Sequence, residues 1–131
     1  MLTDPLYKRS FILLIFIAAM HITAIKFDIY YEVWWFDNIM HFLGGVWVAL
    51  TSFWLYNTSR FTRRFFGPSK PLIVALFSIV VIGILWEVYE YLTDQTYSMI
   101  GYYLDTAKDL VVDLIGAVVA TMYAAKYTQK K

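Results

Sequence analysis

The chain has 131 residues, of which 60% are hydrophobic and 20% aromatic, whereas soluble domains are about 45–50% apolar. Its formal net charge of +1 gives no reason to expect nucleic acid as a partner, and the lack of cysteine excludes disulfides and thiolate metal sites. With a mean hydropathy of +0.57, these figures predict an all-α, polytopic membrane protein with a single transmembrane domain over residues 1–131.

The first predicted span covers residues 6–27, long enough to cross a hydrocarbon core about 30 Å thick. Asp4 and Pro5 precede it as an N-cap and a first-turn proline, the usual start of a helix. No small-residue cleavage pattern follows, and further apolar segments do, so we expect a retained span rather than a signal peptide. His21 lies near the far end, where we interpret it as a headgroup-level histidine rather than a metal ligand.

The second predicted span covers residues 37–56 and follows an aromatic connector of the kind found at membrane interfaces. Asp37 and His41 lie in its first turns. Residues 57–70 then form a predicted basic cytoplasmic loop, in which arginines are interleaved with phenylalanines. Such a segment fits the headgroups of anionic lipids, so we expect membrane lipid rather than nucleic acid as its partner.

The third and fourth predicted spans cover residues 71–91 and 105–127, and both carry carboxylates next to the loop that joins them. Glu87 and Glu90 lie near the end of the third span. Asp105, Asp109 and Asp113 begin the fourth span at four-residue intervals. This spacing places the three aspartates on one face of a helix.

Charge is divided between the two ends of these spans. Of 11 lysines and arginines, all but Lys26 and Lys108 fall in three segments that four spans place on one side of the membrane. The positive-inside rule makes that side cytoplasmic. Of 10 acidic residues, all but Asp4 lie at or near the opposite face, including Asp94, which we interpret as a solvated loop residue. The sequence therefore predicts a multi-pass, four-helix bundle in the inner (cytoplasmic) membrane with both termini inside.

This topology brings His41 and six carboxylates to one depth in the outer half of the membrane: Asp37, Glu87, Glu90, Asp105, Asp109 and Asp113. An ionised aspartate at the centre of a membrane helix costs about 2.5–3.5 kcal/mol. Either several of the carboxylates are therefore protonated, or a divalent cation binds them. Carboxylates suit Mg²⁺, Mn²⁺ or Ca²⁺, and an imidazole favours Mn²⁺, Zn²⁺ or Fe²⁺.

We expect the metal ligands to come from the third and fourth spans, as Glu87, Glu90, Asp105, Asp109 and Asp113. Asp37 and Asp105 fit simple helix N-caps equally well. Small residues one turn deeper would let the helices approach closely beneath the cluster; they are Gly44, Gly45, Gly83, Gly116, Ala117 and Ala120.

Three short pieces of sequence carry a family resemblance: Asp37-x-x-x-His41-Phe42, Glu87-x-x-Glu90 and Asp109-x-x-x-Asp113-x-x-Gly116. Together they resemble the VanZ-like membrane proteins, and more closely the YjdF-like inner-membrane proteins of uncharacterised function. VanZ-like proteins commonly have glutamine at the position of Glu90 and asparagine at that of Asp113. The resemblance covers residues 37–117 and implies a four-helix membrane protein without a settled activity.

Three hypotheses for function follow. In the first, a metal-dependent hydrolase or transferase acts on a lipid or lipid-linked phosphate at the outer leaflet, with His41, oriented by Asp37, as general acid or base. In the second, the cluster serves cation- or proton-coupled transport, although the inner halves of the spans offer no polar continuation. In the third, the carboxylates form a protonated structural network. An oligomer is compatible with all three.

Overall fold

The computed structural model describes residues 4–67, 71–93 and 101–128, and Asp94 lies outside these ranges. All regular structure within them is helical, which confirms the predicted all-α fold. Four helices are long and two are short: α1 (Pro5–Lys26), α2 (Ile29–Glu32), α3 (Phe36–Thr58), α4 (Arg60–Phe66), α5 (Pro71–Leu92) and α6 (Tyr102–Thr128).

Three of the long helices are long and apolar enough to cross a membrane, namely α1, α3 and α5, with 22, 23 and 22 residues. Helix α6 has 27 residues, yet within the described ranges it is not among the helices that meet this standard of length and composition. Its first half carries three aspartates and a lysine. Length and composition therefore support three of the four predicted spans, and the fourth remains a prediction.

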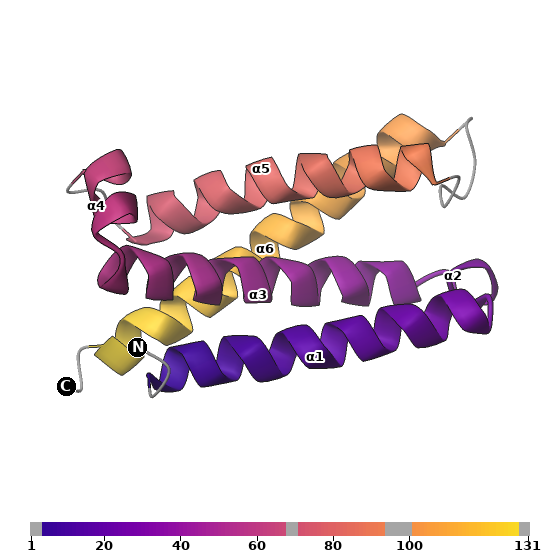
Figure 1. Cartoon of the computed structure of the whole chain (residues 1–131). Coiled ribbons are helices and arrows are strands. Elements are labelled where there is room, and N and C mark those ends of the chain that lie inside the picture. Colours follow the sequence, from indigo (N-terminus) through magenta and orange to yellow (C-terminus); the bar gives the residue numbers. More distant parts are fainter. Residues whose placement is uncertain (1–3, 68–70, 94–100, 129–131) are drawn as a thin grey trace.

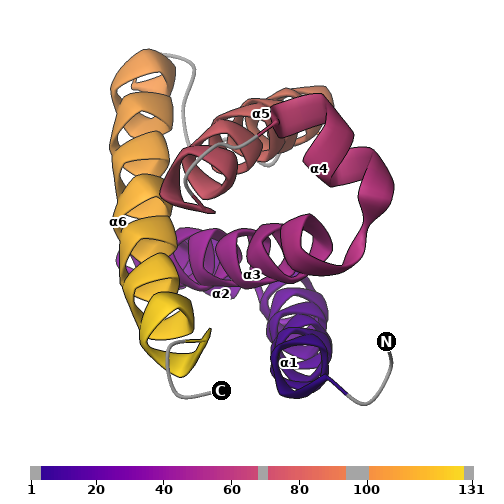
Figure 2. The same ribbon diagram turned by 90° about the vertical axis from the view of Figure 1, so that its left-hand side faces the viewer.

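The long helices α1, α3 and α5 run back and forth along one direction, and α6 crosses behind α5 and α3 at an angle (Figure 1). Helix α3 is central, because it contacts α1, α5 and α6 (Figure 2). The start of α1, the end of α6 and helix α4 lie at one end of the molecule. The opposite end holds α2, the start of α3, the end of α5 and the start of α6. The acidic residues of α3, α5 and α6 belong to that opposite end.

Helix α1 begins as predicted. Asp4 caps it, since its Oδ1 accepts a hydrogen bond from Leu6 N at 2.8 Å, and Pro5 occupies the first turn. At its other end the chain turns through Asp28, which has a left-handed conformation with φ 54°. The short helix α2 then fills the aromatic connector between α1 and α3.

The basic segment, predicted as a loop over residues 57–70, contains helix α4. Ser59 Oγ accepts a hydrogen bond from Thr62 N at 3.4 Å, and Gly67 follows the last turn with φ 58°, a conformation that glycine adopts readily. Phe61 is 78% exposed and Phe65 67% exposed. The predicted loop therefore contains a capped helix, which is too short to show a hydrophobic period in the sequence.

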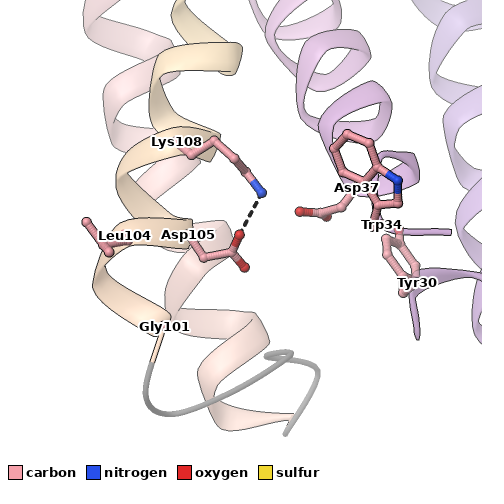
Figure 3. A pocket seen from close by; sticks show the side chains of 7 residues that line it. All are labelled: Tyr30, Trp34, Asp37, Gly101, Leu104, Asp105 and Lys108. Carbon is pink, nitrogen blue, oxygen red and sulfur yellow. Dashed lines mark hydrogen bonds and ion pairs between the residues drawn. The ribbon is translucent and has the colours of Figure 1, made fainter. Parts of the chain in front are cut away.

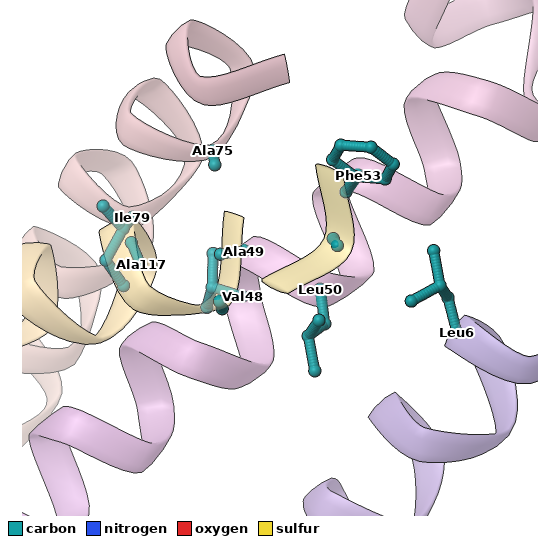
Figure 4. Packing of buried hydrophobic residues seen from close by; sticks show 10 residues of the cluster. Leu6, Val48, Ala49, Leu50, Phe53, Ala75, Ile79 and Ala117 are labelled. Atoms are coloured by element: carbon teal, nitrogen blue, oxygen red, sulfur yellow. The ribbon is translucent and has the colours of Figure 1, made fainter. Parts of the chain in front are cut away.

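Small residues hold α3, α5 and α6 close together beneath the acidic residues, where the hydrophobic core continues (Figure 4). A Cβ atom added to Gly45 would overlap the carbonyl oxygen of Asp113, and one added to Gly116 would overlap that of Phe42. Ala117 and Ala120 are buried as well. The close approach predicted from these residues is therefore present, and α3 and α6 nearly touch backbone to backbone.

Candidate metal centre

The predicted site residues converge where α3 begins, α5 ends and α6 begins. Four of them are almost fully buried, with exposed fractions of 5% for His41, 5% for Glu87, 2% for Asp109 and 4% for Asp113. Buried charged groups in proteins are almost always paired or bound to a metal. Each of these four side chains is therefore expected to form an ion pair or a hydrogen bond, or to bind a metal, within the cluster.

His41 lies at the centre of this cluster. Its Nδ1 atom is 3.4 Å from Asp113 Oδ1. Its Nε2 atom is 3.6 Å from Asp37 Oδ1 and 4.0 Å from Asp109 Oδ2, and it makes no hydrogen bond although it is buried. One ring nitrogen thus has a carboxylate beside it, and the other faces two carboxylates without a hydrogen bond to either.

Three groups of side chains can each bring three ligand atoms within 4.8 Å of one another. They are Asp37, His41 and Glu90; His41, Glu87 and Asp109; and Asp37, Asp105 and Asp109. Among the described residues these groups include all of the predicted site residues except Asp113. Asp113 is instead placed on the Nδ1 side of the His41 ring.

Glu87 is held in place by α6. Its Oε2 accepts a hydrogen bond from Thr106 Oγ1 at 2.6 Å, and its backbone carbonyl accepts one from the Tyr102 hydroxyl at 3.4 Å. Its Oε1 is buried without a hydrogen-bond partner. Sequence reasoning missed Thr106, although it lies three residues before Asp109 and so on the same face of α6.

Glu90 is oriented through aromatic side chains. Its Oε1 accepts a hydrogen bond from Trp86 Nε1 at 2.8 Å. The Trp86 ring lies 5.3 Å from the His21 ring, and His21 Nδ1 is 2.8 Å from the Tyr30 hydroxyl. His21 belongs to none of the three ligand groups of the described chain. Burial, together with the charges of Asp37 and Glu90, raises the pKa of Tyr30, so its hydroxyl stays protonated.

Lys108 supplies a positive charge at the edge of the cluster. Its Nζ is 2.6 Å from Asp105 Oδ1 and 3.3 Å from Asp109 Oδ1. The ligand group that contains Asp105 therefore already holds a cation of its own. The two groups that contain His41 are the better candidates for a metal.

A pocket of about 400 Å³ opens beside the cluster (Figure 3). The ion pair of Lys108 and Asp105 on α6 faces Asp37 on α3, with Tyr30 and Trp34 at the side of the pocket. Its walls therefore combine both signs of charge with aromatic rings.

Glycines leave the space that Asp113 occupies. A Cβ atom on Gly83 would lie 2.8 Å from Asp113 Oδ2, and one on Gly44 would lie 3.9 Å from Oδ1. The carboxylate is thus enclosed between α3 and α5 and held against His41. A rotation of Asp113 away from the imidazole is restricted by this packing.

Comparisons with known proteins give a family and a distant relative. A family model described as "predicted membrane protein (DUF2238)" matches residues 4–130. An uncharacterised protein of Thermotoga maritima is 27% identical in an alignment of 128 residues that covers 94% of this chain and 64% of the relative. No solved structure matches. The membrane-protein class is therefore supported, whereas the likeness to VanZ-like and YjdF-like proteins stays a prediction.

Proposed function

The chain belongs to the DUF2238 family of predicted membrane proteins, and we propose that it binds a divalent metal ion and uses it in hydrolysis or transfer at a lipid-linked phosphate. The observation that carries this proposal is the buried His41 Nε2, which lacks a hydrogen bond and faces the carboxylates of α3 and α6. A buried polar atom without a partner costs about 1–3 kcal/mol. A bound cation would remove that cost at His41 Nε2 and at Glu87 Oε1 together.

The core ligands in this proposal are His41, Glu87 and Asp109, which are all buried and lie in one ligand group. Glu90 adds a further oxygen through a second group that shares His41. An imidazole with several carboxylates fits Mn²⁺ or Zn²⁺ best, with Mg²⁺ and Ca²⁺ as competitors. Because His41 is almost fully buried, it serves as a ligand here rather than as a general acid or base.

In this proposal the hydrolysis or transfer takes place in the neighbouring pocket that Asp37 and Lys108 line. His41, Glu87 and Asp109 would hold a divalent ion beside this pocket, and such an ion would supply Lewis-acid chemistry to a phosphoryl oxygen and lower the pKa of a water molecule. Asp37 lines the pocket and also lies close to the ligand atoms of His41 and Glu90. Its carboxylate can therefore accept a proton from the attacking nucleophile. Lys108 also lines the pocket and offers a positive charge to a phosphate. Tyr30 and Trp34 would pack against the rest of the headgroup.

The outer leaflet of the inner membrane is the proposed location of this chemistry. The basic residues near the start of α1 and in α4 lie at the end opposite the cluster. The positive-inside rule then puts that end in the cytoplasm and makes α6 the fourth span. Membrane lipid is thus the substrate in reach, and self-association stays compatible with the proposal.

Coupled transport is less well supported by the packing. Beyond His41 and Asp113 the buried side chains between α3, α5 and α6 are mainly apolar, as Ala49, Phe53 and Ile79 illustrate. A cation crossing the membrane would need polar partners along its route. The described residues supply them at the acidic end, and only scattered hydroxyls such as Ser52 and Thr121 lie deeper.

Metal content and thermal unfolding of the purified protein test the proposal. We expect stoichiometric metal, and a lower melting temperature after chelation, because a ligand bound only to the folded state stabilises it. Glu87→Gln and Asp109→Asn should abolish both effects. The matched controls Glu32→Gln and Asp28→Asn, at the same end but outside the ligand groups, should keep them. Absence of metal and of any shift after adding Mn²⁺ or Zn²⁺ would favour a protonated network instead.

Turnover is the second half of the test. Asp37→Asn should retain metal through His41, Glu87 and Asp109 but lose activity on long-chain alkyl phosphates. A fully active Asp37→Asn protein would contradict the assignment of the pocket as the reaction site.

A further inference from the structure

A second, apolar cavity of about 150 Å³ lies between α1, α3 and α5. Its walls are formed by Leu14 and Ile17 of α1, Met40 and Trp47 of α3, and Ile79 and Ile82 of α5. His41 and Asp113 also line it. The cavity therefore reaches the same imidazole that the metal centre uses, from the side away from the polar pocket.

The chemistry of this cavity suits hydrocarbon better than water. A buried water needs about two to four polar partners, whereas an apolar cavity of roughly 150 Å³ stays dry and accepts an apolar ligand. The two ionisable residues of its lining, His41 and Asp113, already face each other, with 3.4 Å between Nδ1 and Oδ1. The remaining lining is almost entirely aliphatic and aromatic side chains together with two glycines.

One wall of the cavity reaches the outer surface of the bundle. Ile82 is 42% exposed and forms part of its wall, whereas Met40 at the inner wall is only 7% exposed. Helix α1, which forms the other side, directs large apolar residues such as Ile15 outward with 56% of its surface exposed. In a bilayer the molecules that surround such an opening are lipid chains.

We propose that this cavity binds a single hydrocarbon chain of a membrane lipid, so that the lipid is held with its chain beside His41. Asp37 lines the polar pocket and His41 lines the apolar cavity, and the two side chains are 3.6 Å apart. The polar pocket and the apolar cavity thus adjoin the proposed metal centre from two sides. An amphiphilic lipid could place its head group in the first and its chain in the second. The identity of the chain as part of the substrate rests on the proposed function, but the chain site itself does not need the metal.

Photo-crosslinking of the full-length protein in detergent tests this inference. The probe is a palmitic acid analogue with a diazirine within the first few methylene groups after the head group, and crosslinked residues are mapped by mass spectrometry. We expect crosslinks at Met40 and Trp47, which line the cavity. Ile17→Trp should fill the cavity from α1 and reduce these crosslinks about tenfold, because even a few methylene groups kept out of an apolar site weaken binding by that factor. Ile15→Trp places the same ring on the outer face of α1 and should leave them unchanged.

Labelling confined to outward residues such as Ile15, or equal labelling of Met40 in the two tryptophan variants, would overturn the inference. The same proteins are titrated with Mn²⁺, with crosslinking repeated in chelator. Helix α1 carries none of the ligand groups of the described chain, so Ile17→Trp should bind metal normally. Loss of the chain site is thereby distinguished from failure of the metal centre.

Discussion

At the scale of single residues, the two nitrogens of His41 have different surroundings. Asp113 lies beside Nδ1, while Asp37 and Asp109 face Nε2. Histidines that bind metals commonly donate their second ring N–H to a carboxylate, which fixes the tautomer and the orientation of the ring. In the proposed metal centre Asp113 would be a positioning residue, and Asp109 would be a ligand.

The variant Asp113→Asn therefore tests whether Asp113 orients His41 or binds the metal itself. The asparagine keeps the volume enclosed by Gly83 and Gly44 but weakens the partner of His41 Nδ1. We expect metal affinity to fall about 10–100-fold, as when such an outer partner of a ligand is lost. Asp109→Asn should lose more, because a ligand oxygen is replaced. Titration with Mn²⁺ followed by electron paramagnetic resonance separates the two, with Asp28→Asn as the control. Equal losses in both variants would make Asp113 a ligand.

Lys108 leads to a prediction with two opposite effects. Its Nζ pairs with Asp105 and Asp109 and also lines the pocket. Lys108→Gln removes a charge that repels a cation, so Mn²⁺ should bind a few-fold more tightly, a modest gain because the side chain is 42% exposed. Turnover of an alkyl phosphate should fall, because its phosphate loses a partner. Lys26→Gln, at the same end but outside the pocket, should change neither. Weaker metal binding in Lys108→Gln would contradict this reading.

At the scale of elements, the crossing of α3 and α6 sets the geometry of the centre. The two helices meet where Gly45 faces the backbone of Asp113 and Gly116 faces that of Phe42. Because a backbone carbonyl cannot move as a side-chain tip can, each glycine keeps the helices close enough for His41 Nε2 and Asp109 Oδ2 to lie 4.0 Å apart.

Two adjacent glycines provide a matched test of this crossing. Gly45→Ala places a Cβ on the Asp113 carbonyl, whereas Gly44→Ala places one 3.9 Å from Asp113 Oδ1, an ordinary contact. We expect Gly45→Ala to lower the free energy of unfolding by about 1–3 kcal/mol or more, the usual cost of overpacking. Gly44→Ala should be neutral or slightly stabilising, because alanine favours a helix. Denaturation in mixed micelles measures the free energy of unfolding of both variants. Equal values would show that α3 and α6 can move apart at their crossing without loss of stability.

Much of this arrangement could be predicted from the sequence because hydrophobic length and four-residue spacing are local signals. The long helices, the acidic end and the close contact through small residues all follow from them. Spacing does place Asp109 and Asp113 on one face, but it does not tell which nitrogen of His41 each approaches. That depends on the crossing of α3 and α6. Helix α4 and the Thr106–Glu87 bond were missed since one is short and the other joins distant segments.

At the scale of the whole molecule, the separation of charge makes orientation the decisive property. The site acts on outer-leaflet lipid only if α6 crosses the membrane and the acidic end faces outward. The chain has no cysteine, so single cysteines report on this without background. Suitable positions are Asn57 at the end of α3, Tyr103 at the start of α6 and Ala125 near its end.

We expect a membrane-impermeant maleimide to label Tyr103→Cys from outside intact cells, because Tyr103 is 85% exposed at the acidic end. Asn57→Cys and Ala125→Cys should react only after permeabilisation, as the positive-inside rule requires for the basic end. Labelling of Tyr103→Cys and Ala125→Cys from the same side would mean that α6 does not span. Reversed labelling at all three positions would place the metal centre at the cytoplasmic leaflet and limit its lipid substrates to that side.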